Sequence, residues 1–124
     1  MLKSHHPRRH LNSFKYAFAG LKHVFVNEAN FRLQTVFMIL SFLLALFFHI
    51  DALSWVLVVI SCGMLLGAEI LNTVIEEFID HLIKEHHEGA KVIKDMSAAF
   101  VLVNSFVAVM VFIYVFLPYF ISVF

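Results

Sequence analysis

Three long stretches of this chain contain no charged residue, and they limit what the chain can fold into. They cover residues 33–50, 52–68 and 96–124 of a sequence of 124 residues, 61% of them hydrophobic. A helix needs about 20 apolar residues to cross a ~30 Å hydrocarbon core, and a soluble domain of this length could not bury so much apolar surface. The sequence therefore predicts an all-α integral membrane protein with one domain over residues 1–124. Its membrane helices are expected at about 32–50, 52–80 and 92–118.

A different kind of helix is predicted before the first crossing, within residues 1–30. Its apolar residues recur at alternating spacings of three and four, and its lysines lie elsewhere around the helix: Leu11, Phe14, Phe18, Leu21 and Phe25, against Lys15 and Lys22. An apolar stripe opposite basic residues is typical of an amphipathic helix lying in the membrane surface. The alternative is a soluble helix that packs on the protein itself.

All nine lysine and arginine residues fall on one side of the predicted membrane. Six precede the first crossing and three lie between the second and the third: Lys3, Arg8, Arg9, Lys15, Lys22 and Arg32, then Lys84, Lys91 and Lys94. Because basic residues favour the cytoplasmic side, we expect the N-terminus in the cytoplasm and the C-terminus outside. The polar, basic N-terminus shows no cleavable signal, and the lone Cys62 is expected to be a small buried hydrophobe.

An acidic stripe follows the second apolar run. At about 100° per residue, Glu69, Asn72, Glu76 and Asp80 return to one face of a helix. Ionisable groups near hydrocarbon are costly and by default indicate a functional site. If this helix enters the membrane near Ala52, Glu69 lies about 25 Å along the axis, at the cytoplasmic edge of the hydrocarbon. A water-soluble reagent can meet a lipid headgroup at this depth.

Two further polar segments are expected at the same level. Glu28 lies between Asn27 and Asn30, just before the first crossing, and with Glu76 it is a candidate ligand of a shared Mg²⁺ ion, a metal that favours oxygen ligands and substrate phosphates. Lys94 and Asp95 precede the third apolar run. Lys94 is either an anchor at the membrane surface or a cation that neutralises a phosphate.

Three motifs together resemble the small integral-membrane family of prokaryotic diacylglycerol kinases and undecaprenol kinases. They are NEANFRLQ at 27–34, AEILNTVIEEFID at 68–80 and AKVIKDMSAAFVL at 90–102. The resemblance implies a homotrimeric lipid kinase of the bacterial inner membrane that uses ATP and Mg²⁺, with active sites between subunits at the cytoplasmic interface. Its lipid substrate would be the hydroxyl of undecaprenol or diacylglycerol. The sequence contains no P-loop motif, G-x-x-x-x-G-K-S/T.

The resemblance also implies roles for individual residues. Glu69 matches the proposed catalytic base, and Glu28 and Glu76 match metal-binding carboxylates. Residues at nucleotide-contacting positions are Arg9, Tyr16, Glu28, Glu76, Glu85, His87, Lys94 and Asp95, with Asn72 and Asp80 in the same polar motif. The lipid-substrate side would comprise Glu69, Ala98, Asn30, Phe31 and Gln34. Gln34 stands where some members carry a glutamate, and Phe100 where a small residue is usual; Ala98 and residues 30–32 look more like the undecaprenol-type branch.

Two other classes of function stay open from the residues alone. The histidine-rich segment 81–88 could bind a transition metal, which would suit a small polytopic metal-ion transporter. A non-catalytic membrane oligomer would account for three crossings and for polar residues such as Asn104 and Ser105, but not for the acidic stripe. Phosphorylation of a lipid alcohol by ATP separates the three readings.

Overall fold

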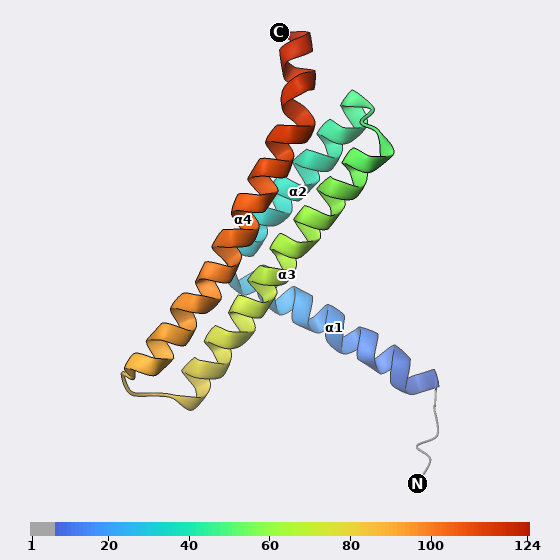
Figure 1. Ribbon diagram of the computed structural model, residues 1–124. Helices are drawn as coiled ribbons and strands as arrows, with labels where there is room; N and C mark the ends of the chain where they lie inside the picture. Colours follow the sequence, from blue (N-terminus) through green and yellow to red (C-terminus); the bar gives the residue numbers. More distant parts are fainter. Residues whose placement is uncertain (1–6) are drawn as a thin grey trace.

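The computed structural model describes residues 7–124, which form four α-helices (Figure 1). These are α1 (Pro7–Asn27), α2 (Ala29–Phe48), α3 (Ala52–Leu82) and α4 (Glu88–Val123). No strand occurs within residues 7–124. The all-helical class predicted from the sequence is confirmed. Residues 1–6 of the predicted surface helix lie outside the described residues.

Helices α2, α3 and α4 pack side by side as a bundle, and each is long and apolar enough to cross a membrane (Figure 1). The integral-membrane class is therefore confirmed. With 31 residues, α3 is about 46 Å long at 1.5 Å per residue, well beyond a ~30 Å hydrocarbon core. Its C-terminal turns, which carry the acidic stripe, extend past the end of the uncharged run.

A tight turn joins α2 to α3 at the end of the bundle away from the acidic stripe. His49 takes the left-handed conformation (φ 53°, ψ 50°), and the N–H groups of His49 and Ile50 donate to the carbonyl oxygens of Leu46 and Ala45, so that free carbonyls at the end of α2 are satisfied. Asp51 then caps α3, because its side chain accepts a hydrogen bond from the Ser54 N–H at 2.9 Å. Hydrogen bonding from Ser54 lowers the pKa of Asp51.

The apolar core of the bundle lies near this turn. Its fully buried residues come from all three membrane helices and the turn between them: Ala45, Ile50, Val58, Cys62, Val115 and Phe116. Aromatic rings extend the core, with Phe48 and Tyr119 stacked at 5.3 Å between ring centroids and Phe112 and Phe116 at 4.7 Å. Cys62 is buried, as the sequence predicted. Because this core holds one end of the bundle together, polar side chains can occupy the other end.

Helix α4 exceeds the range expected from the sequence at both ends. It begins six residues after Leu82, the last residue of α3, where the His87 ring accepts a hydrogen bond from the Ala90 N–H at 3.3 Å and so caps the helix. It also continues through Pro118 to Val123. Proline removes one backbone donor, but here the helix does not end there.

Helix α1 leaves the bundle at a wide angle (Figure 1). Within this fully described helix only Val24 is buried, while the apolar stripe from Leu11 to Phe25 stays exposed. This exposure favours a helix in the membrane surface over one packed on the protein. At the junction with α2, Arg32 donates to the carbonyl oxygens of Phe25 and Val26, both at 2.8 Å, and so binds the C-terminal end of α1.

Candidate active site

The acidic stripe of α3 passes from the bundle interior to solvent. Glu69, Asn72 and Thr73 are buried, Glu76 is half-buried, and Asp80 is exposed. The predicted stripe therefore exists as one face of a single helix. Its residues meet different surroundings: Glu69 is buried against α2, whereas the exposed Asp80 contacts Lys94 near the start of α4.

Glu69 is the most deeply placed carboxyl group of the stripe, with 2% of its surface exposed. Gln34 on α2 donates from its amide nitrogen to Glu69 Oε2 at 2.9 Å. The Thr73 hydroxyl donates to the backbone carbonyl of Glu69 at 2.9 Å, within the same helix. A carboxyl group buried in this way is costly unless it is hydrogen-bonded, and Gln34 supplies a partner.

Asn72 makes a buried contact between α3 and α4. The Ser97 hydroxyl donates to Asn72 Oδ1 at 2.6 Å, and both side chains are buried. Ser97 was not among the residues predicted from the sequence. Ser97 is three residues from Lys94 and so lies on nearly the same face of α4. This spacing is the sequence feature from which the position of Ser97 at the site could have been predicted.

Glu28 immediately precedes α2, and its carboxylate does not bond to the first turn of the helix. The residue occupies the N-cap position, yet its side chain makes no capping hydrogen bond in the described structure. Partial burial raises the pKa of Glu28 above its ordinary value, and the negative charges of Glu76, Glu69 and Glu77 raise it further; the nearby His23 acts in the opposite direction. The carboxylate at the N-cap of α2 thus lies close enough to the carboxylates of α3 to be repelled by them.

Four of the predicted nucleotide-contacting residues line one cavity. The space, about 300 Å³, lies between the end of α3, the connecting loop and the start of α4, and its wall includes Asp80, Glu85, His87, Lys94 and Asp95. Lys94 Nζ donates to Asp80 Oδ1 at 2.8 Å, and Lys91 donates to Asp95 at 2.7 Å. The cavity therefore joins a cationic side chain to carboxylates at the polar end of the bundle.

Other predicted residues are not brought to this cavity within the chain. Arg9 and Tyr16 are exposed on α1, whose N-terminal end lies far from the α3–α4 loop (Figure 1). On the lipid-substrate side, Phe31 is buried, whereas Asn30 and Ala98 are exposed on α2 and α4.

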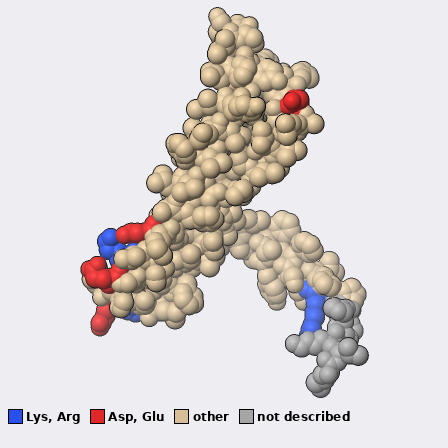
Figure 2. Space-filling model, viewed as in Figure 1, with Lys and Arg blue, Asp and Glu red and all other residues tan. Residues whose placement is uncertain are grey.

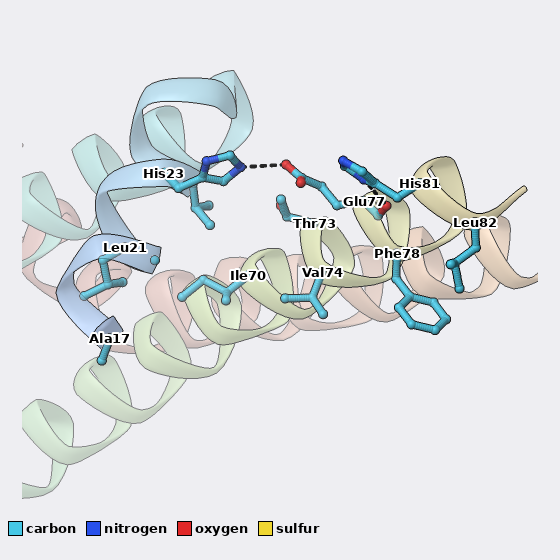
Figure 3. Close-up of a pocket in the computed structure, with 12 residues that line it drawn as sticks. Ala17, Leu21, His23, Ile70, Thr73, Val74, Glu77, Phe78, His81 and Leu82 are labelled. Atoms are coloured by element: carbon cyan, nitrogen blue, oxygen red, sulfur yellow. Dashed lines mark hydrogen bonds and ion pairs between the residues drawn. The ribbon is translucent and has the colours of Figure 1, made fainter. Parts of the chain in front are cut away.

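A groove of about 700 Å³ separates α1 from the C-terminal half of α3 (Figure 3). Its wall is mainly apolar, with Leu21, Ile70 and Phe78 among the residues facing it. His23 and Glu77 bridge it at 2.6 Å between Nε2 and Oε1. The sequence did not single out either residue, because helical spacing places Glu77 outside the acidic stripe and gives no hint of a partner on α1.

These features define a class: an α-helical membrane enzyme whose carboxylate and lysine side chains gather at one end of the bundle. The chain belongs to the prokaryotic diacylglycerol kinase family, whose family model, described as "Prokaryotic diacylglycerol kinase", matches residues 15–116. It is a lipid kinase, a phosphotransferase with an alcohol acceptor, as the sequence predicted. This assignment separates it from metal-ion transporters and non-catalytic membrane oligomers.

Three relatives illustrate the similarity. The diacylglycerol kinase of Escherichia coli (strain K12) is 37% identical over 94 residues, which cover 76% of this chain and 77% of the relative. The diacylglycerol kinase of Synechocystis sp. is 32% identical over 82% of this chain and 58% of its own length. The undecaprenol kinase of Bacillus subtilis (strain 168) is 26% identical over 89% of each chain.

Proposed function

We propose that this lipid kinase transfers the γ-phosphate of ATP, in the presence of Mg²⁺, to the hydroxyl of undecaprenol or diacylglycerol. The main support for the proposal is that the polar face of α3 connects a buried carboxyl group to an open cavity. This face runs from Glu69, buried where the uncharged stretch ends, to Asp80 and Lys94 in the cavity at the polar end of the bundle. A lipid hydroxyl and a water-soluble nucleotide can thus reach neighbouring parts of one helix.

The carboxylates of Glu28 and Glu76 fit a Mg²⁺ ion. They come from different helices, their charges repel, and the Glu28 side chain makes no capping hydrogen bond in the described structure. Within residues 7–124, no three histidine, cysteine, aspartate or glutamate side chains meet as a metal-binding group. Two carboxylates suit Mg²⁺, which is usually bound by one or two carboxylates, with substrate phosphates and water as its other ligands. When bound, the ion would neutralise charge on the phosphate oxygens.

Each residue of the site can then be given a step in the transfer. Glu69 accepts the proton of the lipid hydroxyl, and the alcohol oxygen bonds to the γ-phosphorus. The bond from that phosphorus to the β–γ bridging oxygen breaks, and ADP leaves with the electron pair. Lys94 neutralises phosphate charge during the transfer. To do so, it must exchange its hydrogen bond to Asp80 for one to a phosphate oxygen. Phosphoryl transfer depends on positioning and charge neutralisation of this kind.

The polar end of the bundle is proposed to face the cytoplasm across a bacterial inner membrane, with the C-terminus outside. The distribution of lysine and arginine supports this orientation. The exposed apolar stripe of α1 supports its placement in the membrane surface. We propose a homotrimer, as the family resemblance implies.

Undecaprenol is the acceptor for which we expect the higher kcat/KM. Diacylglycerol carries ester carbonyls that require hydrogen-bond donors, and Ala98 is an exposed residue without a hydroxyl. Contacts with the lipid tails add little discrimination, since one methylene is worth only about 1–3 kcal/mol. The similarity to proteins named diacylglycerol kinase keeps that lipid as the second candidate.

The test uses purified protein in mixed micelles with ATP, Mg²⁺ and either lipid. We expect ADP release matched by phosphorylated lipid, with undecaprenol the better acceptor. Equal or reversed efficiencies would overturn the preference alone. No phosphorylation of either lipid by folded protein would overturn the proposed function.

A further inference from the structure

Gln34 and Glu69 form a contact that the proposed transfer does not explain by itself. Gln34 Nε2 donates to Glu69 Oε2 at 2.9 Å across the interface of α2 and α3. The two residues lie 35 positions apart in the sequence, so the contact depends on the packing of two membrane helices. It joins the residue that we propose as the base to a neutral side chain outside the acidic stripe.

The two oxygens of Glu69 have different surroundings. Among side-chain nitrogen and oxygen atoms of residues 7–124 that are fully shielded from solvent, only Gln34 Oε1 lacks a hydrogen-bond partner. Glu69 Oε1 also accepts no hydrogen bond within residues 7–124, but it is not one of the fully shielded atoms that lack a partner. This oxygen is therefore partly accessible. One oxygen of the carboxyl group is therefore held, and the other is free for an incoming hydroxyl.

The orientation of the Gln34 amide is fixed by this contact. Reversal would place its carbonyl oxygen against the carboxylate, with two acceptors facing each other. Gln34 also lines an apolar cavity of about 330 Å³, where the other polar side chain, Ser105, already donates to the Val101 carbonyl at 2.9 Å. Burial of the Gln34 carbonyl oxygen without a hydrogen-bond partner costs free energy. The hydrogen bond to Glu69 is the interaction that retains the side chain in this orientation.

We infer that Gln34 is the positioning residue of Glu69: it binds Oε2 and so presents Oε1 to the hydroxyl of the lipid substrate. The inference rests on the proposed function, because it assumes that Glu69 is the base. A base must lie within hydrogen-bond distance of the proton it removes. Rotation of the Glu69 side chain away from that geometry lowers the rate without changing the nucleotide site at the C-terminal end of α3.

The main test is Gln34→Met, which keeps the length of the side chain and removes the donor. We expect kcat for the lipid to fall about 10–100-fold, the range for a misplaced reacting group, with KM for MgATP within about twofold of wild type. Thr35→Val is the matched control, because the Thr35 hydroxyl donates to the Phe31 carbonyl of its own helix. It should leave both constants unchanged.

A double variant distinguishes positioning from general damage to packing. If Gln34 acts only through Glu69, Gln34→Met should add almost nothing to the loss caused by Glu69→Gln, because residues that act as a unit are non-additive. A further loss of the same factor in the Glu69→Gln background would overturn the inference. So would a Gln34→Met variant with wild-type kcat.

Gln34→Asn keeps the test valid if Gln34→Met does not fold. This change keeps a polar amide but shortens the side chain by one methylene, so the donor no longer reaches Glu69 Oε2, and kcat should fall at unchanged KM for MgATP. Wild-type kcat in this variant would overturn the inference. Wild-type protein that phosphorylates neither lipid would instead refute the proposed function, which separates the two failures.

Discussion

Glu69 is a carboxyl group that folding removes almost completely from solvent. Its side chain is buried between α3 and α2, with the Gln34 amide as its hydrogen-bond donor. Burial of a carboxylate costs free energy that a similarly shaped apolar residue would not. A group retained at such a cost where the uncharged stretch of α3 ends is better explained by chemistry than by stability.

The first prediction concerns this residue. Glu69→Gln keeps the shape of the side chain and its place in the bundle but removes the proton acceptor. We expect kcat for the lipid alcohol to fall by about 10²–10⁴-fold, the usual contribution of a positioned base, with MgATP binding preserved. Steady-state kinetics and nucleotide titration of the purified variant measure the two quantities. Near-normal turnover would remove Glu69 from the mechanism.

Glu28, which we propose as a Mg²⁺ ligand, shows how a binding residue can reduce stability. Its pKa is raised by burial and by neighbouring carboxylates, so the folded protein binds more protons than the unfolded chain between the ordinary value of 4.5 and the raised value. The free energy of unfolding therefore falls as pH rises through that window, and the loss is complete above it.

The second prediction follows from the direction of this pH dependence. In Mg²⁺-free micelles at pH 7, Glu28→Gln should raise the free energy of unfolding, by no more than about 1 kcal/mol because the side chain is only partly buried and water screens the charges. The gain should vanish below pH 4.5, the ordinary pKa, where Glu28 is protonated in both states. Thermal unfolding measures it, with the exposed Glu85→Gln as control. A gain that persists at pH 4 would contradict the electrostatic cause.

At the scale of helices, the sequence could predict which residues share a face but not what lies opposite them. Uncharged stretches predicted three crossings, and a spacing of three and four residues predicted the acidic stripe. The partners of that stripe come from other helices: Gln34 binds Glu69, and Ser97 binds Asn72. Periodicity within one helix contains no information on the rotation of its neighbour, so these pairs appear only once the helices are packed.

The third prediction concerns the contact between α3 and α4. Ser97→Ala leaves the buried Asn72 oxygen without its donor, so we expect a loss of about 1–2 kcal/mol in the free energy of unfolding, as for other buried polar groups left unpaired. Ser105→Ala is the matched control on the same helix, because the Ser105 hydroxyl donates to a carbonyl of its own helix. Its cost should be smaller. Equal effects of the two variants in thermal unfolding would show that the Asn72 contact adds nothing.

At the scale of the whole molecule, charge and apolar surface are separated. Charged side chains gather on the polar end of the bundle and on α1, apart from a small acidic patch at the α2–α3 turn, and a broad uncharged band lies between (Figure 2). The band fits the hydrocarbon of a membrane. Helix α1 extends away from its own bundle (Figure 1), so its polar residues can reach either the membrane surface or a neighbouring subunit of the proposed trimer.

The last prediction tests whether α1 serves a neighbouring subunit in the proposed trimer. Arg9 on α1 and Asp95 at the α4 cavity are both expected to contact nucleotide, yet the chain separates them (Figure 1). We expect Arg9→Gln and Asp95→Asn each to lose activity alone, and a mixture of the two to recover it. In equal mixtures, a site built from two different chains has both intact residues in about one quarter of cases, whereas a site within one chain never has both. Activity of affinity-purified mixed oligomers measures the recovery, and its absence would place each site within a single chain.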